Sequence, residues 1–151
     1  MNSEKQKTLV SAEEEQDISR KMMIWVNSFS DDAMPAAIIN YEFLAADSVG
    51  MSLSMIQGAY ITRKYILGGH EAEYQFKIIA RIKPGTSNDK RLKADAMLNR
   101  FGDWAMRNYP NFSGGVRVRR IDVSSRAALF AMYEDGWEDH QILMKMTYEV
   151  I

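Results

Sequence analysis

The chain has 151 residues, a length that suits one domain with its own hydrophobic core, and a formal net charge of −1. This balance of charge provides no overall field that would draw the protein to nucleic acid or to an anionic membrane. The absence of cysteine excludes disulfides, thiolate metal sites and a cysteine nucleophile. There is no apolar leader and no apolar run of about eighteen residues, so we expect a soluble protein made in the cytoplasm.

A helix is expected near the N-terminus, after a first segment, residues 1–10, that we expect to be disordered or frayed. Ser11 and Glu14 have the spacing of a capping box, in which each side chain satisfies a free amide at the helix start. The helix is expected to end near Ser28, and residues 11–151 are expected to form a single domain. Apolar residues recur at helical spacing on one face of this helix: Ile18, Met22, Trp25, Val26 and Phe29.

The next part of the sequence predicts strands and a long hairpin. A short apolar run at 36–43 predicts one strand, and alternation from 52 to 66 predicts another, which turns at Gly68-Gly69. A strand of about twelve residues spans roughly 40 Å, whereas a compact domain of this length has a radius of gyration of about 15 Å. The hairpin therefore either protrudes, where it would invite pairing with a neighbouring chain, or is broken at Gly58 and bends around one core. The returning strand carries on one face Tyr74, Phe76, Ile78, Ala80 and Ile82.

The second half of the chain predicts another helix and more strands. Ser87 is the expected N-cap of this helix, and Pro110 ends it. Strands are expected at 116–123, 127–133 and 142–150. The predicted fold class is α+β, with a mostly antiparallel β-sheet, two helices packed on it and a long protruding hairpin. The buried face of the second helix is expected to contain Ala94, Met97, Leu98, Phe101, Trp104 and Ala105.

Few residues have the pattern of a catalytic or metal site. His70 lies beside the hairpin turn, next to Glu71 and Glu73, and His140 is far from it in the sequence. A hydrolytic zinc site needs three converging protein ligands, so we interpret His70 as a solvated turn residue. No nucleophile elbow, phosphate-binding loop or dinucleotide fingerprint is present. We therefore predict no catalytic residue, no cofactor and no metal.

The charged clusters are interpreted as surface features. Acidic residues at 13–15 and within 134–139 fall at a helix start and around a turn, where solvated charge is expected. Arg117, Arg119 and Arg120 are the best candidates for contact with a polyanion, and alternation places the first two on one strand face and the third on the other. The alternative is a sheet face kept soluble by charge, since no aromatic stacking platform or DNA-reading helix accompanies the arginines.

A central block of short motifs resembles a known protein family. The motifs are Met51-Ser52-Leu53-Ser54-Met55-Ile56-Gln57-Gly58, Tyr65-Ile66-Leu67-Gly68-Gly69, Glu73-Tyr74-Gln75-Phe76 and Asn99-Arg100-Phe101-Gly102-Asp103-Trp104. Their order resembles that of the minor capsid or tail-completion proteins of long-tailed bacteriophages, the group that includes tail terminators. The strands around Asp135-Gly136 also fit the C-terminal hairpin of that family. Leu67 departs from it, because the family often has Asp before the glycine.

The resemblance implies a structural virion protein and not an enzyme. Six copies are expected to form a ring at the head-proximal end of the phage tail. The ring would stop polymerisation of the major tail-tube protein and offer a docking surface to the head–tail connector. DNA would be a partner only in transit through the lumen, and no membrane or cofactor is implied.

Two sets of residues are assigned to this assembly. Arg117, Arg119 and Arg120 are the candidates for a surface facing the lumen and DNA. Two other functions stay open, a head-completion or connector protein of the phage neck and a small enzyme that uses His70 with Glu71 or Glu73. The hairpin residues expected at the oligomer interface are Tyr60, Thr62, Lys64, Tyr65, Ile66, Gly68, Gly69, Tyr74 and Phe76.

Overall fold

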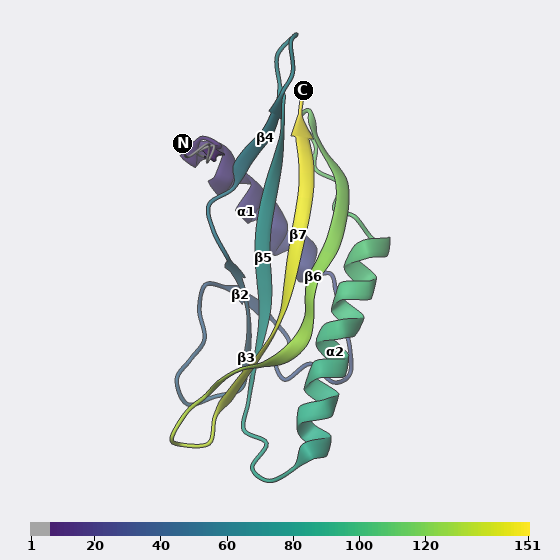
Figure 1. Ribbon diagram of the computed structural model, residues 1–151. Helices are drawn as coiled ribbons and strands as arrows, with labels where there is room; N and C mark the ends of the chain where they lie inside the picture. The colour runs from purple at the N-terminus through teal and green to yellow at the C-terminus, as the bar shows by residue number, and fades with distance from the viewer. Residues whose placement is uncertain (1–6) are drawn as a thin grey trace, which may run out of the picture.

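The computed structural model describes residues 7–151 (Figure 1). Within these residues it contains two helices and seven strands, an α+β fold. The elements are β1 (Thr8–Leu9), α1 (Ala12–Val26), β2 (Ile39–Tyr41), β3 (Gly50–Met55), β4 (Tyr60–Lys64), β5 (His70–Ile82), α2 (Asn88–Arg107), β6 (Val116–Met132) and β7 (Glu138–Val150).

Strand β5 is the centre of the sheet. One of its edges pairs with β7 along its full length, and β7 in turn pairs with β6. The other edge pairs with β3 and β4, which follow one another along it. Among the described residues the sheet has seven strands, and β2 with β3 is its parallel pair. The predicted fold class, a mostly antiparallel sheet with two helices, is confirmed.

Both helices contribute to the core on one face of the sheet. Alternation along β5 and β7 directs Tyr74, Phe76 and Met144 to this face, where they are fully buried. The two helices meet through aromatic side chains, and the Trp25 and Trp104 rings stack at 5.2 Å. In Figure 1, α1 lies behind the sheet and α2 runs alongside β6, which leaves the opposite face of the sheet without a covering helix.

Both helix starts form as the sequence predicts. The Ser11 hydroxyl accepts a hydrogen bond from the amide of Glu14 at 3.1 Å, and Ser87 accepts one from Lys90 at 3.2 Å. The carboxylate of Glu14, however, forms hydrogen bonds to His70 and Tyr148. Only the Ser11 half of the expected capping box is therefore formed. Helix α2 ends at Arg107, near the predicted stop.

Several predicted boundaries differ from the structure because tertiary pairing sets them. The strand expected at 36–43 is reduced to β2, since it pairs with β3 over three residues. The strands expected at 116–123 and 127–133 are one strand, β6, which stays continuous through several register shifts. The segment predicted to be frayed, residues 1–10, begins to pair at β1, which is antiparallel to β4, while residues 1–6 lie outside the described part.

The predicted long hairpin strand is divided. Strand β3 ends at Met55 and β4 begins at Tyr60, so the chain bends between them, around the predicted break at Gly58. Only β4 and the first residues of β5 form the hairpin. Its tip nevertheless projects beyond the C-terminal end of β7 (Figure 1). The segment is therefore broken near Gly58, as one interpretation predicts, and its hairpin tip protrudes, as the other predicts.

Candidate assembly surface

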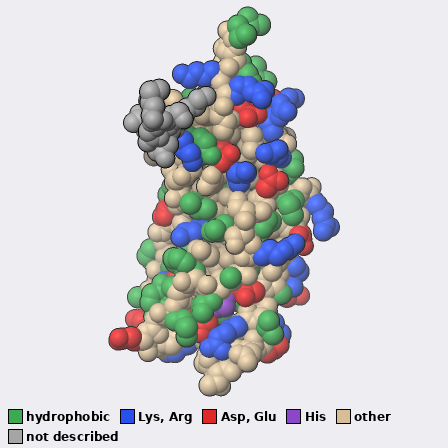
Figure 2. Space-filling view, viewed as in Figure 1, with side chains coloured by type: hydrophobic (Ala, Val, Ile, Leu, Met, Phe, Trp, Pro, Cys, Tyr) green, Lys and Arg blue, Asp and Glu red, His purple; other side chains and the backbone are tan. Residues whose placement is uncertain are grey.

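The tip of the β4–β5 hairpin is an apolar projection. Ile66 and Leu67 are 101% and 100% exposed, the highest values among the large apolar residues that the structure describes. Figure 2 shows hydrophobic side chains at the end of the projection and lysine and arginine side chains around its base. Water-exposed apolar groups at the end of a projection are typical of a contact site for another molecule.

Two glycines shape the turn at this tip. Gly68 and Gly69 have φ values of +99° and +82°, in a region that residues with a Cβ rarely adopt. The amide of Gly68 donates to the carbonyl of Tyr65 at 3.2 Å, and the amide of Tyr65 donates to the carbonyl of Gly69 at 3.1 Å. A Cβ on Gly69 would lie 2.2 Å from the carbonyl oxygen of Val150. The end of β7 therefore requires glycine at this position.

A tyrosine–glutamate hydrogen bond fixes the base of the hairpin. The Tyr65 hydroxyl donates to Oε2 of Glu149 at 2.8 Å, and Arg117 Nη2 donates to Oε1 of the same carboxylate at 2.7 Å. The hydrogen bond from Tyr65, followed by that from Arg117, holds the pKa of Glu149 below its ordinary value, and the same bond raises the pKa of Tyr65. The base of the hairpin is thus bonded to β7, the last strand.

A second anchor joins the hairpin to α1. His70 Nε2 lies 2.9 Å from Oε2 of Glu14, and the Tyr148 hydroxyl donates to the same oxygen at 2.7 Å. The interpretation of His70 as a solvated turn residue is wrong, because its side chain is largely enclosed by these contacts. Glu14 was recognisable in the sequence only as a capping residue. Its partners are 56 and 134 residues away, and no local pattern points to them.

The carboxylates next to His70 have other partners. Glu71 accepts a hydrogen bond from Thr62 at 2.9 Å, and Glu73 accepts one from the hydroxyl of Tyr60. Burial is the main cause that raises the pKa of Tyr60 to about 12, and the hydrogen bond to Glu73 is the second cause. The pairs of His70 with Glu71 or Glu73 that an enzyme would have used are therefore not brought together.

The predicted interface residues divide between surface and core. Thr62, Lys64, Ile66 and Gly68 are exposed, and Tyr60, Tyr65 and Gly69 are half-buried. Tyr74 and Phe76 are fully buried in the core instead. They alternate to the face that the helices cover, so their side chains stabilise the fold and are not free to contact a neighbour.

The arginine strand departs from simple alternation. A register shift between Val118 and Arg120 places Arg117 opposite Glu149 and Arg120 opposite Thr147. Residues directly opposite each other in a ladder point to the same face, so Arg117 and Arg120 share the face without helices. The expectation that Arg120 lies on the other face is wrong, because the bulge changes the alternation by one residue.

Each of these arginines has an acidic partner. Arg117 and Arg119 lie 2.7 and 3.3 Å from Glu149, and Arg120 lies 3.1 Å from Asp122. The side chains of Arg117 and Arg120 remain more than half exposed. The strand is therefore a charged surface whose positive charge is partly balanced within the sheet.

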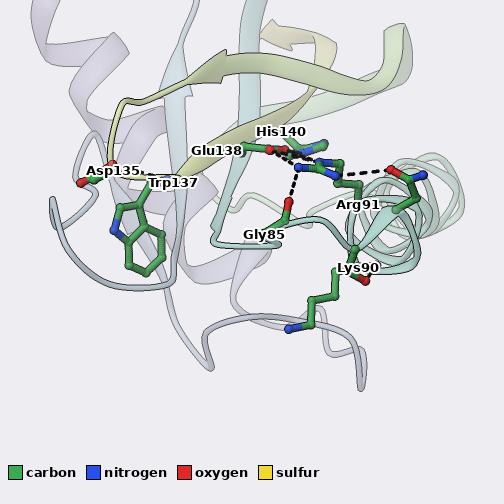
Figure 3. Close-up of polar contacts among 9 residues, drawn as sticks. Gly85, Lys90, Arg91, Asp135, Trp137, Glu138 and His140 are labelled. Carbon is green, nitrogen blue, oxygen red and sulfur yellow. Dashed lines mark hydrogen bonds and ion pairs between the residues drawn. The ribbon is translucent and has the colours of Figure 1, made fainter.

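A buried ionic cluster lies at the opposite end of the sheet (Figure 3). Glu138 and His140 are each 2% exposed, and His140 Nε2 lies 3.1 Å from Oε1 of Glu138. Arg91 of α2 donates to Glu138 at 2.8 Å and to the carbonyl of Gly85 at 2.6 Å. His140 Nδ1 lies 2.7 Å from the Asp95 carboxylate. The cluster fastens α2 to the first residues of β7.

The acidic residues around the last turn are thus not all solvated, contrary to the prediction from the sequence. Glu138 faces α2, and hydrogen bonds from Arg91 hold its pKa below the ordinary value. Asp139 points to the other face, where Arg81 donates to it at 2.7 Å and the Tyr133 hydroxyl at 2.7 Å. Both carboxylates are buried because arginines from distant segments neutralise them.

The side chains in the clusters around Glu14, Glu149 and Glu138 pair with other residues of the fold. Among residues 7–151, no three histidine, aspartate or glutamate side chains gather as ligands of a metal ion would. In the same part of the chain, no helix combines the length and apolar character needed to cross a membrane. No protein-family model matches the chain, and no curated protein matches it significantly.

Proposed function

We propose that the protein is a tail terminator of a long-tailed phage, a structural protein that acts by assembly and catalyses no reaction. Six copies form a ring on the head-proximal end of the tail tube, stop its polymerisation and offer a surface to the head–tail connector. The observation that carries the proposal is the β4–β5 hairpin, which has an anchored base and a fully exposed apolar tip. The resemblance of the central sequence block to tail-completion proteins supports it.

The energetics of the hairpin favour assembly. Burying an isoleucine or leucine side chain is worth about 1.5–3 kcal/mol relative to leaving it in water, so the tip offers a few kcal/mol to a partner. Because Tyr65 and His70 hold the base in place, the tip loses less conformational freedom on docking than a mobile loop would. A contact between two different surfaces of identical copies repeats from copy to copy, and it forms a ring when the rotation between copies closes.

The proposal assigns each partner to a different surface. The lower face of the ring matches the tail-tube subunit, and the upper face does not, so tube subunits find no template beyond it. The face with Arg117, Arg119 and Arg120 is assigned to the lumen, where DNA passes in transit. Its positive charge is partly paired, which suits weak contacts with moving DNA more than tight binding. The protein needs no cofactor and no membrane and resides in the virion.

Electron microscopy of tail-tube protein polymerised with and without this chain tests the proposal. We expect tubes of restricted length with a ring of extra density at one end. Tubes that grow to the same length and carry no added density would refute the proposal. A chain that binds the portal assembly and ignores the tube protein would instead be a head-completion or connector protein.

A further inference from the structure

A groove runs along α1 on the surface of the protein. Its volume is about 520 Å³, within the roughly 300–1,000 Å³ that small-ligand pockets span. The groove is open and mainly apolar at its surface. The lining residues are Ala12, Glu15, Gln16, Ser19, Arg20, Met23 and Tyr41.

The polar groups at the floor of the groove are already satisfied. Ser19 Oγ lies 2.8 Å from the Tyr74 hydroxyl, and Glu15 Oε1 accepts the amide hydrogen of Ala59 at 2.8 Å. Met23 is half-buried, and the Tyr41 ring is 44% exposed to solvent. An apolar occupant would therefore gain contact with Met23 and Tyr41 without leaving the Ser19 hydroxyl unpaired.

The surroundings of the groove are acidic, and those of the hairpin tip are basic. Glu13 and Asp17 are exposed on the first turns of α1, the helix that lines the groove. Asp17 forms an ion pair with Lys21 at 3.0 Å, Glu13 has no basic partner within 4 Å among the described residues, and Arg20 is the basic residue of the lining. Arg63 and Lys64 are exposed just before the tip. Within residues 7–151, neither has a carboxylate within 4 Å, so their charges stay available to a partner of opposite sign.

We propose that the hairpin tip of one copy seats Ile66 and Leu67 in the α1 groove of a second copy. Arg63 and Lys64 then lie against the acidic residues of the partner's α1. The tip points away from α1 of its own chain, so a chain does not fill its own groove (Figure 1). The two contacting surfaces differ, which makes the contact head-to-tail and suited to a closed ring. This inference names the subunit contact of the proposed terminator ring and in that respect rests on the proposed function.

Engineered cysteines test the contact cleanly, because the natural chain has none. The double variant Leu67→Cys/Gln16→Cys places one thiol on the tip and one in the lining of the groove. On mild oxidation we expect a ladder of covalently linked copies, since a disulfide forms only between Cα atoms about 4.4–6.8 Å apart. The matched control is Leu67→Cys/Leu92→Cys, whose second thiol lies on exposed α2. Equal ladders in the two variants, or none in either, would overturn the inference.

Charge reversal gives a second, independent readout. In the first double variant, adding Arg63→Glu and Lys64→Glu is expected to lower the yield of the ladder roughly tenfold, the effect of about 1.4 kcal/mol. Adding Glu13→Lys and Asp17→Lys to that variant is expected to restore it. A ladder that is indifferent to both changes would contradict the proposed polarity of the contact. Thermal unfolding of each variant verifies that the fold is retained.

The outcomes separate this inference from the proposed function. A ladder without capping of tail tubes supports the hairpin–groove contact and refutes the terminator function. Capped tubes without a ladder support the terminator function and refute the hairpin–groove contact. Cross-links from the engineered thiol on the tip to the tube protein, with none to a second copy of the chain, would also refute that contact.

Discussion

The hydroxyl of Tyr65 donates a hydrogen bond to the carboxylate of Glu149, 2.8 Å away, and so joins the base of the hairpin to the penultimate residue of β7. The two residues are 84 positions apart in the sequence. Directly beyond Tyr65, the side chains of Ile66 and Leu67 are fully in solvent. The most exposed apolar part of the described chain is therefore presented from a fixed position.

Replacing Tyr65 by Phe removes this hydrogen bond and keeps the ring. Arg117 and Arg119 still hold Glu149, so we expect little change in the melting temperature and faster amide exchange confined to residues 65–70. Hydrogen–deuterium exchange measures the hairpin and the rest of the chain together. Tyr109→Phe, at an exposed tyrosine after α2, is the control. Unchanged exchange at the hairpin would show that the bond does not fix its base.

Replacing Leu67 by Asp tests the role of the tip in assembly. The side chain makes no contribution to the core, so we expect unfolding within about 0.5 kcal/mol of the natural chain. Capping of tail tubes is expected to be lost, because a carboxylate is costly to bury in an apolar site. The matched control, Leu92→Asp on α2, should cap normally. Retained capping by Leu67→Asp would contradict an essential contact at the tip.

Replacing Glu138 by Gln tests the buried ionic cluster. The change leaves Arg91 without its charged partner, whereas His140 keeps the Asp95 carboxylate, and we expect a loss of about 1–3 kcal/mol in the free energy of unfolding at pH 7. Urea unfolding measures it. Glu134→Gln, at an exposed position of the neighbouring turn, should leave stability unchanged. Equal effects of the two variants would mean that the cluster contributes nothing beyond surface charge.

The same cluster predicts a pH dependence. The pKa of Glu138 is lower in the folded chain than the ordinary 4.5, chiefly because of the hydrogen bonds from Arg91. A carboxyl with a lowered pKa stabilises the fold above its unfolded pKa and loses that effect as the pH falls through the folded pKa. The stability difference between the natural chain and Glu138→Gln should therefore be full at pH 7 and shrink below about pH 4.5. A difference that grows in acid would contradict the assignment.

The two turn glycines should respond differently to alanine. Gly68 has open space where a Cβ would lie, so Gly68→Ala is expected to cost only the strain of positive φ, about 1–2 kcal/mol. Gly69→Ala adds a collision with the carbonyl of Val150 and is expected to cost more. Thermal unfolding ranks the two variants. A smaller loss for Gly69→Ala would mean that the end of β7 moves freely.

The elements with local signals could be predicted from the sequence alone. Ser11 and Ser87 cap the two helices, because the spacing of a cap to its amide is set within one turn. The alternation of Tyr74, Phe76 and Ile78 identified the buried face of β5, because side chains of a strand point to opposite faces in turn. These features led to the α+β fold class, which the structure confirms.

The positions of the charged side chains depend on contacts between distant parts of the chain. Glu138 and Asp139 are buried because they meet Arg91 and Arg81, which are 47 and 58 residues away, and no local pattern contains such pairings. The bulge near Arg119 likewise depends on the register with β7, so alternation alone placed Arg120 on the wrong face. Local periodicity decides which side of an element is apolar. The partner across the sheet decides which charges are buried and which surface remains for assembly.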